Sequence, residues 1–110
     1  MFEIEKNLEF QHSDGNITIK VIPGDAHLMT TLVYKNGKLI KNGDGTIEVI
    51  VEAKTGDLFK IISTVFKQVG SDHASITIII SNENHTESLP IKIKVPDHDT
   101  VVFKVNIQLI

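Results

Sequence analysis

The stretch "TVVFKVNIQLI" (residues 100–110) alternates apolar and polar side chains with a period of two. One parity holds Val101, Phe103, Val105, Ile107 and Leu109, and the other holds Lys104, Asn106 and Gln108. Successive side chains of a β-strand point to opposite faces of the sheet. The stretch therefore predicts a strand with one buried and one solvated face, which is typical of antiparallel sheets packed in two layers.

The same alternation recurs along the rest of the chain. It predicts strands near 2–10, 17–22, 27–35, 38–41, 46–53, 58–69, 74–81, 91–95 and 100–110. Turn signals separate these runs about every 8–12 residues, the spacing of a sandwich or barrel. Among the turns, Asn36-Gly37 predicts a type I′ hairpin, because both central residues of that turn need a positive φ. Phe59 and Phe66 fall on opposite parities, so we predict a β-bulge near Ser63 that turns both inward.

Composition supports an all-β chain. Ile, Val and Thr number 17, 10 and 9, whereas Ala numbers 3. β-Branched residues fit a pleated sheet and are stiff in helices. With 110 residues, the chain is predicted to form a single β-sandwich domain over 1–110.

One segment also carries a family resemblance. The stretch "TGDLFKIISTVFKQVGSDHASITIII" (residues 55–80) resembles the middle of bacterial immunoglobulin-like adhesion and accessory domains. In those domains a turn of Gly and polar residues opens a strand that leads through a further Gly into another alternating strand. The likeness covers about a quarter of the chain. It implies an immunoglobulin-like antiparallel sandwich, here of about eight or nine strands, and brings no functional residue with it.

Several function classes are not expected from the composition. The chain has no Cys, which excludes disulfides, thiolate metal sites and a Cys nucleophile. All 11 basic residues are Lys, and Trp is absent, so the preferred phosphate and base contacts are missing and no nucleic-acid partner is expected. No GxSxG elbow and no Gly-rich loop leading into a helix occurs, so we do not expect an enzyme.

The compartment stays open at this level. The start "MFEIEKNLEF" is charged at positions 3, 5, 6 and 9, so it is not the apolar core of a signal peptide. No stretch approaches the roughly 20 apolar residues of a membrane helix, so no membrane span is expected. A chain without Cys suits a reducing cytoplasm, which this composition favours slightly over the secreted β-domains that also lack it.

The acids and histidines suggest a metal site at one end of the domain. Each of the five His lies within two residues of an acid, and imidazole with carboxylate is good ligand chemistry for Zn²⁺. If successive turns alternate between the two ends of the sandwich, one end collects Asp25, Asp44, Asp72, His73, Asp97, His98 and Asp99. This set predicts a Ca²⁺ or Zn²⁺ site, and no other cofactor is expected. The alternative is a group of polar turns that face water.

A second candidate site lies in the polar connection "NENHTESLP" (residues 82–90), which we expect to be a loop. Its residues Asn82, Glu83, Asn84 and His85 suit hydrogen bonds to a glycan, with or without a divalent metal. Sugar recognition usually stacks a ring on Trp or Tyr, and this chain offers only Tyr34. Tyr34 is instead predicted to pair with Leu39 across the hairpin.

The remaining signal is association. Five apolar residues fall on the parity expected to face water: Ile22, Ile50, Ile79, Val102 and Ile110. The first four are the predicted partner-binding residues. Neighbouring apolar side chains on one sheet would form a patch that needs a partner. The sequence thus predicts a non-enzymatic binding or assembly module that pairs with another protein or with itself. The alternative function is a small lectin-like glycan-binding protein.

Overall fold

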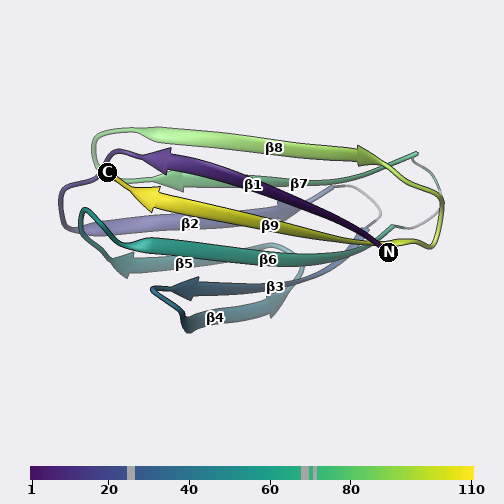
Figure 1. Ribbon diagram of the computed structural model, residues 1–110, viewed down its shortest axis with the longest axis horizontal. Coiled ribbons are helices and arrows are strands. Elements are labelled where there is room, and N and C mark those ends of the chain that lie inside the picture. Colours follow the sequence, from purple (N-terminus) through teal and green to yellow (C-terminus); the bar gives the residue numbers. More distant parts are fainter. Residues whose placement is uncertain (25–26, 68–69, 71) are drawn as a thin grey trace.

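The computed structural model describes residues 1–24, 27–67, 70 and 72–110, which form two β-sheets (Figure 1). The strands are β1 (Phe2–Phe10), β2 (Asn16–Pro23), β3 (His27–Lys35), β4 (Lys38–Asp44), β5 (Ile47–Glu52), β6 (Leu58–Lys67), β7 (His73–Ser81), β8 (Thr86–Lys94) and β9 (Thr100–Leu109). The predicted all-β sandwich is confirmed, and its immunoglobulin-like type stays a prediction. No helix within the described ranges is long and apolar enough to cross a membrane.

The two sheets differ in size and in their edge strands. Sheet A has the order β1-β9-β6-β3-β4, and sheet B has the order β5-β2-β7-β8. β1 runs parallel to β9, and the other paired strands are antiparallel. Figure 1 looks through both layers, with β1 and β8 along one margin and β4 and β5 toward the other.

The core lies where alternation predicts it. The inward parity of β9 is buried at every position from Val101 to Leu109, and β2 and β7 bury their alternate residues in the same way. The fully buried residues with the largest side chains include Phe10, Phe59, Phe103, Ile17, Ile19, Ile61, Ile76, Ile78, Ile80, Ile107 and Leu109. Phe59 and Phe103 come from sheet A, whereas Ile19 and Ile78 come from sheet B, so both layers contribute to one apolar cluster.

The predicted bulge near Ser63 is wrong. β6 pairs without a shift to β3 on one side and to β9 on the other, and a bulge would interrupt both ladders. Phe59 therefore points inward and Phe66 outward, and Ser63 and Lys67 take buried positions. The Ser63 hydroxyl is satisfied by the Thr31 hydroxyl at 2.8 Å. The register shift in this sheet lies between Val33 and Tyr34, opposite the edge strand β4.

Two predicted loops are partly strand. β8 begins at Thr86, inside the segment 82–90 that we expected to be a loop. Its first half is polar because β8 is an edge strand with one face in water, and Pro90 is tolerated at such an edge. β4 likewise continues through Asn42-Gly43, where the chain was expected to break. A Cβ at Gly43 would lie 2.9 Å from the Ile47 side chain, so this close approach requires glycine.

The hairpin between β3 and β4 follows the prediction. Asn36 and Gly37 have φ values of 50° and 82°, as a type I′ turn requires. Tyr34 faces Leu39 across the two strands, so the predicted pair is confirmed.

Candidate functional site

One end of the sandwich, here called the Asp/His end, holds Asp44, Asp72, His73, Asp97, His98 and Asp99. Each of three carboxylates there serves a near neighbour: Asp72 Oδ1 lies 2.6 Å from His73 Nδ1, Asp99 accepts the Thr100 N–H at 2.8 Å, and Asp44 accepts the Thr30 hydroxyl at 2.8 Å. The hydrogen bond from His73 lowers the pKa of Asp72, because it favours the charged carboxylate.

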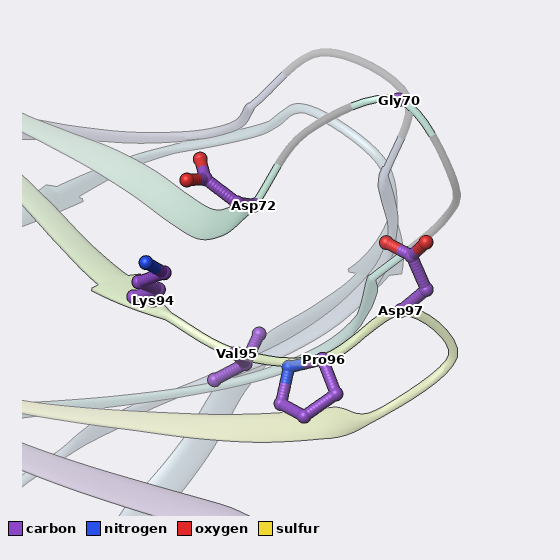
Figure 2. A pocket seen from close by; sticks show the side chains of 6 residues that line it. All are labelled: Gly70, Asp72, Lys94, Val95, Pro96 and Asp97. Atoms are coloured by element: carbon purple, nitrogen blue, oxygen red, sulfur yellow. The ribbon is translucent and has the colours of Figure 1, made fainter.

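These residues do not gather around one point. Within the described residues, no group of three His, Asp or Glu could hold a metal ion. Figure 2 shows Asp72 beside Lys94 and Asp97 on the side of Gly70, with Val95 and Pro96 between the two acids. They line an open hollow of about 640 Å³. Asp25 lies outside the described residues, so the metal site that includes it stays a prediction.

Asp97 has a structural partner that the sequence did not suggest. The side chain of Lys67, at the end of β6, is fully buried and donates to the Asp97 carboxylate. The backbone holds the same turn, because Lys67 N–H donates to Asp99 O at 3.0 Å and His98 N–H donates to Lys67 O at 2.9 Å. His98 is exposed, and its φ is 63°. The turn Asp97-His98-Asp99 thus covers a buried lysine.

The opposite end, here called the His12 end, is organised by a buried histidine. His12 Nε2 lies 3.0 Å from Ala53 O and 3.1 Å from Gly15 O. Its Nδ1 accepts the side-chain amide of Asn82 at 3.0 Å. A ring that donates at Nε2 and accepts at Nδ1 is neutral. His12 therefore ties together the connections β1–β2, β5–β6 and β7–β8.

The predicted glycan residues divide between structural and exposed positions. Asn82 Oδ1 accepts the backbone N–H groups of Asn84 and His85 at 2.9 and 3.0 Å, and the His85 ring stacks on Phe10 at 4.4 Å. Glu83 and Asn84 are exposed. A polar hollow of about 410 Å³ beside them is lined by His12, Ser13, Asp14, Gly15, Asn16, Thr18, Ser81, Asn82, Glu83 and Asn84. The structure thus places Asn82, Glu83 and Asn84 on one hollow with the β1–β2 connection.

Asp57 is a second buried polar group at the His12 end that sequence reasoning missed. Its side chain is 8% exposed and accepts the Asn36 side-chain amide at 2.9 Å and the Lys54 N–H at 3.0 Å. The Asn36 hydrogen bond and then the Lys54 hydrogen bond lower the pKa of Asp57, and burial opposes them. Asn36 in turn accepts the Leu58 N–H at 2.9 Å. The sequence signal that could have pointed to Asp57 was its place in the polar turn Thr55-Gly56-Asp57, which the structure puts beside the Asn36-Gly37 hairpin.

The outer face of sheet A carries a group of apolar side chains, here called the sheet A face. It consists of Leu28, Leu32, Tyr34, Leu39, Leu58, Ile62, Phe66 and Val102. Its members meet as cross-strand pairs: Leu28 with Phe66, and Leu32 with Ile62. Leu28 is 61% exposed and Phe66 is 38% exposed. The pair Thr30–Thr64 lies between these two apolar pairs, so the face mixes apolar and polar side chains, and exposed apolar side chains gathered on one face are typical of a surface that binds a partner.

The four residues predicted to bind a partner do not share a face. Ile22, Ile50 and Ile79 lie on the outer face of sheet B, and Val102 lies on the sheet A face. On sheet B they stand apart, because Ile50 faces Thr18, Ile79 faces Lys20 and Ser88, and Ile22 faces Thr77. Sequence parity found outward-facing apolar positions, whereas only strand pairing shows which ones touch.

Comparison with family models, curated proteins and solved structures finds no match to this chain.

Proposed function

We propose that this chain is a non-enzymatic binding module that associates with a protein surface through the sheet A face. The observation that carries the proposal is the pairing of Leu28 with Phe66 and of Leu32 with Ile62 on adjacent strands. Burying paired apolar side chains against a partner removes contiguous apolar area from water, which is the main driving force of association.

The four edge strands argue for the face as the binding surface. β1 carries Glu and Lys side chains along its length, and β8 contains Pro90. β4 carries charged residues and pairs with β3 through a register shift. β5 is only six residues long and contains Glu48 and Glu52. Charges, proline and bulges keep edge strands from pairing with other chains. The edges are thus protected against strand pairing, which leaves the sheet A face, where Lys60 and Lys104 lie among the apolar side chains, as the surface for association.

A photo-crosslinking residue placed at Thr64 or at Thr77 tests the proposal. Both threonines sit on interior strands and face outward, Thr64 on the sheet A face and Thr77 on sheet B. We expect irradiation in cell extract to give a discrete adduct from position 64 and none from position 77, with the partner identified by mass. Adducts at neither position, or equally at both, would contradict the proposal.

The polar hollow at the His12 end supports a second candidate function, which is glycan binding. Its lining is rich in carboxylate, amide and hydroxyl groups, which suit the hydroxyls of a sugar. Asp14 and Glu83 are the exposed acids of this lining, and Asn16 and Asn84 are its exposed amides. A glycan array with and without EDTA tests the idea and any need for a divalent metal. We expect Glu83→Gln with Asn84→Ala to remove binding, and an array without signal would end this candidate.

A further inference from the structure

We infer that His12 is an acid-sensitive switch, which holds the connection between β7 and β8 (residues 82–85) while its ring is neutral and releases it when the ring takes up a proton. The inference goes beyond the proposed binding surface, because it concerns a change of conformation at the His12 end and needs no partner. It is carried by the hydrogen bonds on the two ring nitrogens and by the burial of the ring.

The hydrogen bonds of the His12 ring fix its protonation state. Both neighbours of Nε2 are carbonyl oxygens, Ala53 O at 3.0 Å and Gly15 O at 3.1 Å, so Nε2 carries the hydrogen of the ring. The neighbour of Nδ1 is the side-chain amide nitrogen of Asn82 at 3.0 Å, which donates to it. A proton on Nδ1 therefore displaces the hydrogen bond from Asn82.

The Asn82 amide cannot adapt by turning over, because both of its ends have partners. Its nitrogen also donates to Gln11 O at 3.1 Å, and its Oδ1 accepts the N–H groups of Asn84 and His85 at 2.9 and 3.0 Å. A reversed amide would set its oxygen against Gln11 O and its nitrogen against two N–H groups. A protonated His12 and the present form of this connection thus exclude each other.

The surroundings of the ring do little to compensate an added charge. His12 is 4% exposed, and a buried charge is costly without an ionised partner. Among the described residues, none of the charged or titratable groups around the ring hydrogen-bonds to it or forms an ion pair with it. Asp14 and Glu83 are exposed, so water screens their charges. The groups that face the ring or adjoin its partners are Asp14, Lys54, Glu83, His85 and the carboxylate of Ile110, the last residue of the sequence.

The direction of the pH dependence follows from these contacts. The closed connection is compatible with the neutral ring, so it is stable at neutral pH and loses this stabilisation as the ring is protonated. Histidine side chains ordinarily change charge between about pH 5 and pH 8. Asn82, Glu83 and Asn84 line the polar hollow of about 410 Å³, so their release changes the shape of that hollow. The change takes place at the end of the sandwich that holds the C-terminus (Figure 1).

NMR of the ¹⁵N-labelled full chain at about pH 7.5 and about pH 5 tests the switch, with ring spectra to report the protonation of each histidine. We expect the order parameters of the Asn84 and His85 amides to fall from about 0.85 to below about 0.6 as the His12 ring is protonated. The Asn36 amide, which donates to Leu58 O at 2.8 Å at the same end, should stay rigid at both pH values. A His12 ring that stays neutral in acid, or that is protonated while the two amides stay rigid, would overturn the inference.

Two matched variants distinguish His12 from His85, the other imidazole beside these hollows. His12→Gln keeps an amide donor but cannot be protonated, so the order parameter of the Asn84 amide should be the same at both pH values. His85→Gln should keep the fall in acid. A response that persists in His12→Gln, or that disappears in His85→Gln, would assign the pH dependence to another group and reject the switch.

Asn82→Asp tests the same contact without altering His12, so it does not depend on whether His12→Gln folds. The introduced carboxylate accepts hydrogen bonds only, so it can receive one from a protonated Nδ1 and still accept the Asn84 and His85 N–H groups. We expect the Asn84 amide of this variant to be at least as rigid at about pH 5 as at about pH 7.5, the reverse of the wild-type response. Release of the connection in acid, as in the wild type, would show that the contact between Asn82 and His12 is not the switch.

Discussion

The two ends of the sandwich have similar polar sequences but use them differently. At the His12 end, His12 and Asp57 are buried and each joins separate connections of the fold. At the Asp/His end, Asp72 and His98 are exposed, and Asp72 pairs with the next residue in the chain. Burial of a hydrogen-bonded group, and not the mere presence of Asp or His in a turn, decides how much stability that group contributes.

The largest expected effect is that of His12→Ala. Removing the ring leaves the buried Ala53 carbonyl without this partner and takes one of the two acceptors, His12 Nδ1 and Gln11 O, from the half-buried Asn82 amide. Each such group costs about 1–3 kcal/mol, so we expect a loss of about 3 kcal/mol in the free energy of unfolding. Urea titration followed by circular dichroism measures it. A loss below about 1 kcal/mol would remove the contrast between the two ends.

Asp97→Ala tests the contact of the buried Lys67 side chain at the Asp/His end. It removes the Asp97 carboxylate from the Lys67 side chain; breaking a fully buried pair costs about 3–5 kcal/mol, and we expect about 2 kcal/mol because Asp97 is half-exposed. The double variant Lys67→Met with Asp97→Ala should recover most of that loss, since a neutral side chain of similar length fills the same space. A double-mutant cycle in urea measures the coupling. Additive effects would show that the pair does not stabilise this end.

Asp57→Asn tests how the stability of the His12 end depends on pH. The pKa of Asp57 is lowered in the folded state, so its ionised form adds stability above the unfolded value of about 4. This contribution is lost as the pH falls through the lower folded-state pKa. We expect the variant to be less stable than wild type by about 1 kcal/mol at pH 7, with the difference closing below about pH 4. A difference independent of pH in urea titrations would contradict this assignment.

The smallest effect is expected for His98→Gly, the counterpart of His12→Ala at the other end. His98 is exposed and holds a φ of 63°, which glycine adopts without steric cost. We expect a change within about 0.5 kcal/mol, in either direction. Thermal unfolding is sufficient to measure the change. A loss of stability as large as that of His12→Ala would show that the exposed His98 contributes as much to stability as the buried His12.

Sequence reasoning was most successful where only the parity of one strand mattered. The inward set of β9 and the Asn36-Gly37 hairpin followed from alternation and turn chemistry. It failed at β6, where the alternation buries the charged residue Lys67 and turns the apolar residue Phe66 outward. This is the reverse of the usual distribution of charged and apolar side chains. The buried lysine is acceptable because the Asp97 carboxylate, 30 residues away, reaches it. Such a long-range partner has no signal in a single sequence.

For the candidate sites too, the sequence predicted local features and missed the long-range contacts. The sequence named exposed apolar residues but distributed them over two opposite faces, and it missed the pairing of Leu28 with Phe66. It named the 82–85 segment but not its contact with His12. Both omissions concern residues that are distant in the chain and adjacent in space.

By itself, the sequence determined the all-β class, the alternation that assigns the core and the chemistry of the tightest turn, because these depend on side-chain period and local backbone preference. Only the tertiary structure decided the strand order, the buried partners of His12 and Lys67, and the apolar face of sheet A. These features depend on which distant strands hydrogen-bond and in what register. Many pairings satisfy the same alternation, and packing of the whole core selects one of them.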